Sequence, residues 1–185
     1  NRSPRQIAEA GVAHVPEERI QMGTVPNLSL RENLILKRYR YPPFCRSIFL
    51  NRRASIENAR RAIALYQIAA PSDATPAKLL SGGNIQRLVL ARELSGDPRL
   101  IVAAHPTYGL DVGATEQVRQ ILLKERERGA AILLTSEDLE EILAVSDRIL
   151  VMFSGEVMGT LEAEGADLGE IGLLMAGTRQ KGGTT

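Results

Sequence analysis

Short apolar strands alternate with amphipathic helices through the second half of this chain, and that alternation most restricts the possible fold. Apolar runs at Leu100–Ala104, Ala131–Leu134 and Arg148–Phe153 have the length of buried strands, and an amphipathic segment at Ala114–Arg128 separates the first two. A strand–helix–strand order predicts parallel pairing, because parallel strands need a long crossover connection. We therefore predict an α/β fold built on a parallel sheet.

A helical block interrupts this pattern in the first half of the chain. A helix is predicted from Ser3-Pro4 to Gly11, and a buried strand follows at Val12–Val15. The apolar spacing then becomes helical over three segments, which are Leu30–Leu36, Arg53–Ile68 and Gly83–Leu94. Because sheet strands flank this block on both sides, we expect an inserted helical subdomain.

The end of the chain predicts a helix and a hairpin. Ser136 is expected to cap a helix over Glu137–Val145, and Ser154-Gly155 to turn a β-hairpin between Arg148–Phe153 and Glu156–Thr160. The predicted organisation is a core segment at 1–28, a helical subdomain at 29–95, further core at 96–176 and a flexible tail at 177–185.

Composition excludes several classes of protein. Apolar residues make up 44% of the 185, which excludes wholesale disorder, and a net charge of +1 gives no overall attraction to nucleic acid or acidic lipid. No apolar run approaches the ~20 residues that cross a bilayer. The single cysteine, Cys45, excludes an internal disulfide framework, and with two distant histidines the sequence offers no metal-ligand cluster.

The sharpest local motif is Leu80-Ser81-Gly82-Gly83-Asn84, which stands directly before an apolar-periodic helix. A serine and two glycines at a helix start leave backbone N–H groups and a hydroxyl at the positive end of the helix dipole. Such a turn suits a phosphate. By themselves, these residues also fit a plain helix N-cap that binds no ligand.

The same segment resembles the signature sequence of ABC-type ATPases, in the variant ending in asparagine that is typical of ATPase subunits of simple-sugar and nucleoside importers. The resemblance covers nearly the whole chain in the family's order. Residues 11–19 resemble the Q-loop region of a second cassette, with Glu17 at the glutamine position. Residues 106–114 resemble the segment after Walker B, with Asp111 in the D-loop, and residues 136–143 resemble the switch region. The resemblance implies a P-loop NTPase (RecA-like) core.

Several departures from the family pattern fall in the chain's own hydrolytic site. The family's Walker B strand ends in Asp-Glu, which helps to hold Mg²⁺ and polarises the attacking water. Ala104 and His105 stand at these places; alanine does neither, and the histidine either acts as a base or only fills the position. Glu137 replaces the switch histidine and would repel a γ-phosphate. The resemblance therefore implies no confident catalytic residue on this chain.

A Gly-x-x-x-x-Gly-Lys-Ser/Thr phosphate loop occurs nowhere in the sequence. In the family this Walker A loop precedes the Q-loop, so we expect it N-terminal to Asn1 and the core to be incomplete there. Its strand would lie between those resembling Ala131–Leu134 and Arg148–Phe153. In ABC dimers the signature of one cassette closes over nucleotide held by the other. Leu80–Asn84 are thus implied to serve a partner's site, with ATP and Mg²⁺ held mainly by that partner and none bound to this chain alone.

The resemblance also implies partners and a location. A second ATP-binding cassette, fused or separate, and membrane permease subunits are expected, at the cytoplasmic face of the bacterial plasma membrane. Without the Walker A strand, unpaired backbone and exposed apolar edges would remain in the sheet. Self-association is one way to cover them.

A basic stretch from Arg31 to Arg61 leaves an alternative open. It holds nine basic residues against Glu32 and Glu57, and four of the seven aromatic residues. It is interpreted as a solvated face, as a surface near the permease and lipid headgroups, or as a nucleic-acid site. The last interpretation describes a non-transport ABC-type protein that acts on nucleic acid or ribosomes. With a near-zero net charge, we do not expect nucleic-acid binding.

Overall fold

The computed structural model describes residues 1–178, which form two compact units. The first unit is Asn1–Thr135 and the second begins at Ser136. Of the predicted flexible tail at 177–185, residues 179–185 lie outside the described residues. No helix among the described residues combines the length and the apolar character needed to cross a membrane.

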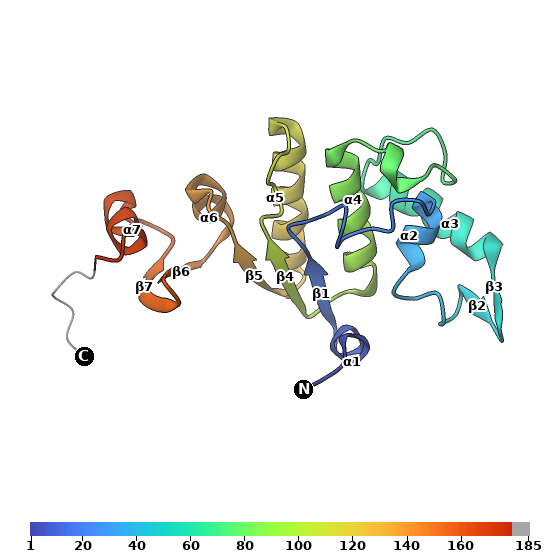
Figure 1. The fold of residues 1–185 in the computed structure, drawn as a ribbon, viewed down its shortest axis with the longest axis horizontal. Helices are drawn as coiled ribbons and strands as arrows, with labels where there is room; N and C mark the ends of the chain where they lie inside the picture. The colour runs from blue at the N-terminus through green and yellow to red at the C-terminus, as the bar shows by residue number, and fades with distance from the viewer. Residues whose placement is uncertain (179–185) are drawn as a thin grey trace. The chain divides into compact units, whose positions relative to one another are not determined.

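A three-stranded parallel sheet forms the centre of the first unit (Figure 1). Strands β1 (Val12–Val15) and β5 (Ala131–Thr135) each pair in parallel with β4 (Leu100–Ala104), which lies between them. Helix α5 (Val112–Glu127) connects β4 to β5, and the predicted α/β fold with a parallel sheet is confirmed. The apolar core of this sheet and its helices consists of Ala13, Val15, Val89, Leu90, Leu94, Ile101, Ala103, Val118, Leu122 and Ala130.

Helices are the main regular structure between β1 and β4. They are α2 (Leu30–Ile35), α3 (Arg52–Leu65), a 3₁₀ turn at Ala77–Leu79, α4 (Gly82–Glu93) and a second 3₁₀ turn at Leu94–Gly96. Ser29 Oγ accepts the amide of Glu32 at 3.4 Å, and a Glu32 carboxylate oxygen accepts the amide of Ser29 at 2.8 Å. This reciprocal pair is a capping box that fixes the start of α2. A separate apolar cluster joins these helices: Leu30, Leu34, Ala59, Ile68, Ala77, Leu80, Ile85, Leu88 and Ala91.

A short strand pair in the helical block was not predicted from the sequence. Strands β2 (Cys45–Arg46) and β3 (Phe49–Leu50) form an antiparallel pair in the helical block. Each has two residues, which is too short for a periodic signal. The first helix, α1 (Pro4–Glu9), follows its prediction, with Ser3 as N-cap and Gly11 at φ +86° beyond its end. Glycine adopts that left-handed angle without steric cost.

The second unit is a hairpin packed with two helices. Strands β6 (Arg148–Phe153) and β7 (Glu156–Glu162) pair antiparallel, so the predicted hairpin is confirmed. Helices α6 (Leu139–Val145) and α7 (Leu168–Met175) stand on either side of it in the chain, and α7 was not predicted. The core of this unit is Ile149, Val151, Ala163, Ile171 and Leu174, against which Leu139, Ile142 and Leu143 of α6 pack.

The predicted start of α6 is wrong by two residues. Asp138, and not Ser136, is the N-cap: its Oδ1 accepts the amides of Glu140 and Glu141 at 2.9 and 3.3 Å. Ser136 Oγ instead accepts the amide of Asp138 at 3.1 Å. A carboxylate bonds to helix-start amides more strongly than a hydroxyl because it also favours the positive end of the helix dipole.

Among the described residues, the open sheet edges at β5 and β6 carry exposed apolar side chains. β5 has a hydrogen-bonded neighbour only on its β4 side, and its Leu133 side chain is 56% exposed. β6 pairs only with β7, and its Leu150 and Met152 are 55% and 58% exposed. An unpaired strand edge with exposed apolar side chains is able to take up another strand.

Candidate functional site

The turn before α4 lies at the molecular surface. Ser81 caps the helix, with extended backbone angles (φ −65°, ψ 160°), and its Oγ accepts the amide of Asn84 at 3.4 Å. Its carbonyl accepts the amide of Ile85 at 2.9 Å. Ser81 is exposed, while Gly82 and Gly83 are half-buried. The plain N-cap reading is thus correct as a description of the helix start, and the turn is also accessible to a ligand.

The two ends of the motif anchor this turn. Leu80 is 9% exposed and belongs to the apolar cluster of the helical block. The Asn84 amide Nδ2 donates to Ser81 Oγ at 2.8 Å, and its Oδ1 accepts the amide of Ala69 at 2.7 Å. Asn84 therefore ties the turn to the preceding loop. Because Ser81 Oγ accepts both bonds, its own hydrogen remains available to a ligand.

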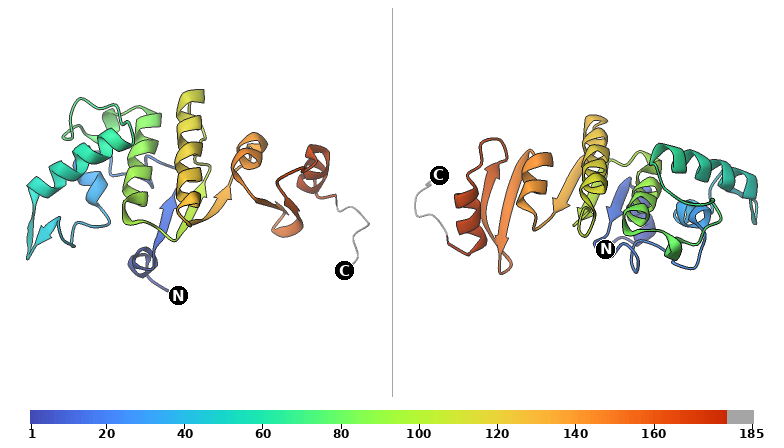
Figure 2. Two further views of the ribbon diagram at one scale, coloured as in Figure 1. Left: turned by 180° about the vertical axis from the view of Figure 1, so that it is seen from behind. Right: turned by 90° about the horizontal axis from the view of Figure 1, so that it is seen from above.

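The starts of α4 and α5 lie side by side (Figure 2). A Cβ on Gly83 would stand 3.4 Å from Ala114 Cβ, so the first turns of the two helices touch. Asp111 is the exposed N-cap of α5, and its Oδ1 accepts the amide of Ala114 at 2.9 Å. The structure thus brings the predicted signature and D-loop positions together, with two positive helix ends facing the same region.

The segment after β1 also reaches this region. Glu17, the expected Q-loop position, is exposed. Arg19, which sequence reasoning did not select, donates from one terminal nitrogen to the Tyr108 carbonyl at 2.6 Å and from the other to the Gly109 carbonyl at 3.4 Å. Its position just past the end of a parallel strand was the available signal, because sites in such sheets gather at the carboxyl ends of the strands.

Ala104 and His105 end β4 at the same edge of the sheet, and both are half-buried. His105 has φ +44°, a left-handed angle that is uncommon for a residue with a side chain. Its amide donates to the Thr135 carbonyl at 2.8 Å, and its carbonyl accepts the amide of Tyr108 at 3.1 Å. The backbone of His105 therefore shapes the turn that leads to Asp111.

These side chains do not fit a magnesium ion. Mg²⁺ takes oxygen ligands in a near-octahedral arrangement, whereas Ala104 offers no side-chain ligand and His105 only nitrogen. Within residues 1–178 no group of His, Cys, Asp or Glu side chains is placed to hold a metal. Glu137 belongs to the second unit, where it is exposed.

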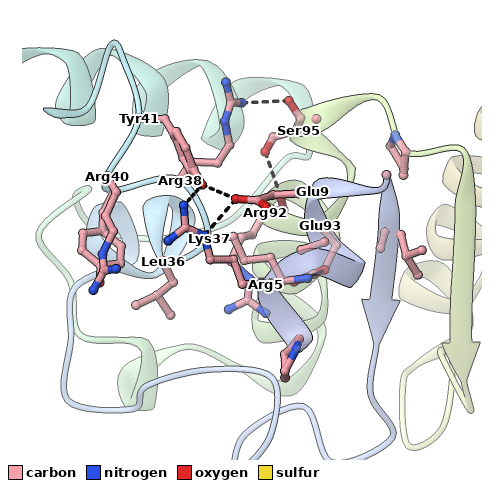
Figure 3. A pocket seen from close by; sticks show the side chains of 18 residues that line it. Arg5, Glu9, Leu36, Lys37, Arg38, Arg40, Tyr41, Arg92, Glu93 and Ser95 are labelled. Atoms are coloured by element: carbon pink, nitrogen blue, oxygen red, sulfur yellow. Dashed lines mark hydrogen bonds and ion pairs between the residues drawn. The ribbon is translucent and has the colours of Figure 1, made fainter. Parts of the chain in front are cut away.

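A pocket of about 500 Å³ lies at the other end of α4 (Figure 3). It is bounded by α1, the start of β1 and the segments that end α2 and α4. At its floor the buried Glu93 pairs with Lys37 and Arg92 and accepts the amide of His14 at 3.1 Å. α4 is 12 residues long, so the pocket is about 18 Å from the turn before this helix. None of the sequence-predicted site residues lines it.

A polar cluster in the wall of this pocket joins α1 to the segment after α2 (Figure 3). The Tyr41 hydroxyl donates to a Glu9 carboxylate oxygen at 2.5 Å, and Arg5 donates to both at 2.8 Å. These bonds, from Tyr41 first and Arg5 second, lower the pKa of Glu9 below its ordinary value. The bonds to Glu9 first and to Tyr41 second raise the pKa of Arg5. The cluster is exposed, so it fixes geometry more than it adds stability.

Comparison with known proteins identifies sequence relatives. No family model matches the chain. It is 40% identical over 181 residues to the guanosine import ATP-binding protein NupO of Bacillus subtilis (strain 168), and this match covers 98% of the chain and 36% of the relative. It is 42% identical over 179 residues to the glucose import ATP-binding protein TsgD13 of Haloferax volcanii, covering 96% and 32%. The chain thus spans about a third of the length of these relatives.

Solved structures share its fold. The ATP-binding cassette MJ0796 in a dimeric post-hydrolysis state, bound to ADP and Pi, superposes with a TM-score of 0.70 at 22% identity, over 90% of this chain and 70% of that one. Another dimeric structure of MJ0796, a bacterial ABC transporter cassette, gives 0.71 at 23% identity, over 87% and 66%. The chain therefore has the fold of an ABC ATPase cassette, and its homologues are ATP-binding proteins of sugar and nucleoside import.

Proposed function

We propose that this chain is part of an ATP-binding cassette that energises import of a sugar or a nucleoside, and that it supplies its signature turn to ATP held by a facing cassette. The observation that carries the proposal is the accessible turn at Ser81–Gly83, which opens α4 beside the N-terminus of α5. The names of the relatives, which include guanosine and glucose importers, support the substrate class.

The turn has the chemistry for a terminal phosphate. Backbone amides at the start of α4 and the free hydroxyl hydrogen of Ser81 are donors, and the helix dipole favours an anion there. Such pre-organised donors act on the charge that develops during phosphoryl transfer. Binding of ATP would close the two cassettes on each other, hydrolysis at the facing site would reopen them, and the motion would pass to the membrane subunits.

The chain's own site is proposed to be inactive. Ala104 and His105 supply no carboxylate for a metal ion or an attacking water, and Glu137 adds a negative charge where the family has histidine. We infer that ATP and Mg²⁺ are held mainly by the partner cassette and that this chain alone hydrolyses no ATP. Its role is then to complete a site whose reactive groups lie elsewhere.

Partners and location follow from the same proposal. The dimeric cassettes among the structural neighbours support a facing cassette as partner, and the length of the relatives, about three times that of the matched segment, suits a fused one. Membrane permease subunits would be the other partners, at the cytoplasmic face of the plasma membrane. Binding of nucleic acid through residues 31–61 has less support, because Phe44 is buried and Tyr41 is bonded to Glu9.

Replacing Ser81 with arginine in the complete protein tests the trans role. The substitution removes the hydroxyl and fills the turn, so ATP turnover at the facing site should fall at least ~100-fold, as on loss of a key donor to a transition state. The matched control is Ser3→Arg, since Ser3 is likewise an exposed N-cap serine, on α1. Unchanged turnover in Ser81→Arg, with a normal control, would defeat the proposal.

A further inference from the structure

Arg19 links three segments that are distant in the sequence. Its guanidinium donates to the carbonyls of Tyr108 and Gly109, just ahead of the D-loop residue Asp111. The same group lies against the turn before α4: a Cβ added to Gly82 would meet the second terminal nitrogen of Arg19 at 3.0 Å. The segment after β1 is therefore joined to both parts of the candidate site through one side chain.

The backbone that carries Arg19 is closely constrained. The amides of Met22 and Gly23 both donate to the Glu18 carbonyl, at 2.8 and 3.1 Å, which closes a tight turn around Arg19. A Cβ on Gly23 would stand 2.5 Å from the Arg19 carbonyl oxygen, closer than real Cβ atoms approach backbone. A side chain at position 23 would therefore force the backbone at Arg19 to shift.

Glycines also make room for the guanidinium where it ends. Gly109 has φ +64°, and a Cβ on it would meet the same terminal nitrogen of Arg19 at 3.5 Å. Gly82 and Gly109 therefore both leave room for the guanidinium because neither has a Cβ. The planar guanidinium reaches two carbonyls from one fork, which a lysine ammonium does not do.

The partners of Arg19 are neutral. Within residues 1–178 its guanidinium forms no ion pair, and its two bonds go to backbone carbonyls. The contact therefore depends on geometry more than on charge neutralisation. It holds the Tyr108–Gly109 turn, whose other bonds are the short-range ones from the amides of Tyr108 and Leu110 to the carbonyls of His105 and Thr107.

We propose that Arg19 is a positioning residue that holds the D-loop lead-in against the signature turn, so that both are presented to the facing cassette as one rigid surface. This inference rests on the proposed trans function for its purpose, but its structural part stands on the contacts alone. It makes Arg19 a direct connection between the signature turn, at Gly82, and the D-loop lead-in, at residues 108 and 109.

Amide hydrogen exchange on the 185-residue chain tests the structural part. In Arg19→Ala the amides of Tyr108 and Leu110 should exchange about tenfold faster, equivalent to ~1.4 kcal/mol. Amide exchange in β4 and the melting temperature should stay unchanged in Arg19→Ala. In Arg19→Lys the exchange rates of Tyr108 and Leu110 should lie between those of Arg19→Ala and those of the unaltered chain. The control is Arg60→Ala, an exposed arginine of α3. Unchanged exchange at both amides, or a uniform increase over the whole unit, would overturn the proposal.

ATP turnover of the complete protein tests the purpose. With the proposal correct, Arg19→Ala should lower kcat several-fold with KM for ATP nearly unchanged, because the nucleotide is held by the facing cassette. Normal kcat in Arg19→Ala, together with the loss expected for Ser81→Arg, would overturn the positioning role and leave the trans function standing. Normal turnover in both variants, with faster exchange at Tyr108, would overturn the trans function and keep the structural role of Arg19.

Discussion

The turn before α4 and the end of β4 lie in the same unit, yet only the first keeps the groups that phosphate chemistry uses. At the turn the donors are backbone amides and one hydroxyl, all supplied by the way the helix starts. Under the proposed function, the end of β4 would need two carboxylates, and Ala104 and His105 stand there instead. A function built on backbone geometry survives sequence change more readily than one built on particular side chains.

The end of β4 nevertheless keeps its shape. His105 holds a left-handed backbone angle, and its amide and carbonyl bond to Thr135 and Tyr108. The same turn carries the chain to Asp111, the cap of α5, which stands next to the signature turn. Under the proposed function, the altered region still serves the intact one, as the support for its D-loop.

Among variants that test this contrast between the two regions, the largest change in stability and ATP turnover is expected on substitution of Asp111. Asp111→Ala removes the cap of α5 and should lower the free energy of unfolding by about 1 kcal/mol. Asp111→Asn keeps an acceptor for the Ala114 amide and should leave the melting temperature almost unchanged. If Asp111 also contacts the facing cassette, both variants lower ATP turnover of the complete protein. Turnover that falls only in Asp111→Ala would mean that Asp111 acts as a cap alone.

Substitution of His105 by glycine is expected to change the free energy of unfolding by a smaller amount and in the opposite direction. Left-handed backbone costs a residue with a side chain roughly 1–2 kcal/mol, and glycine escapes this cost but loses ~0.5–1 kcal/mol to chain entropy. His105→Gly should therefore raise the free energy of unfolding by about 0.5–1 kcal/mol, measured by urea denaturation.

ATP turnover of the complete protein should stay the same in His105→Gly and in His105→Ala. Both variants remove the imidazole, but only His105→Gly also removes the steric cost of the left-handed backbone angle. A clear loss of turnover in both would show that the histidine acts as a base, and would break the contrast between the two regions.

The smallest change is expected for Tyr41→Phe, in the polar cluster at the far end of α4. Glu9 owes its lowered pKa first to the Tyr41 hydroxyl, so Tyr41→Phe should move the pKa of Glu9 up toward its ordinary value. A depressed carboxyl pKa stabilises the fold above the unfolded value of 4.5, and this contribution is lost as pH falls through the folded pKa.

Titration of the Glu9 carboxyl by NMR measures this shift. Tyr39→Phe is the control, since within residues 1–178 the Tyr39 hydroxyl bonds to Arg40 and not to Glu9. ATP turnover should be equal in both variants, because the cluster lies about 18 Å from the signature turn along α4. A Glu9 pKa that does not move in Tyr41→Phe would contradict the assigned cause.

Local signals explain how much of the fold was predictable. Ser29 and Glu32 stand three residues apart ahead of an apolar run, and they form the capping box that this spacing predicts. Ser81 caps α4 for the same local reason. At α6 the local signal was ambiguous, since Ser136 and Asp138 both precede the helix, and the carboxylate took the cap. Strands of two residues at β2 and β3 carried no pattern to detect.

Local patterns were enough to predict the strands of the parallel sheet, the C-terminal hairpin and the starts of α1, α2 and α4, because these depend on neighbours along the chain. The exposure of the signature turn, the contact of Gly83 with Ala114 and the bonds from Arg19 to Tyr108 and Gly109 became visible only in the folded chain. Those contacts join residues up to 90 positions apart. Such pairings follow from how the parallel strands align their carboxyl ends, which no local pattern specifies.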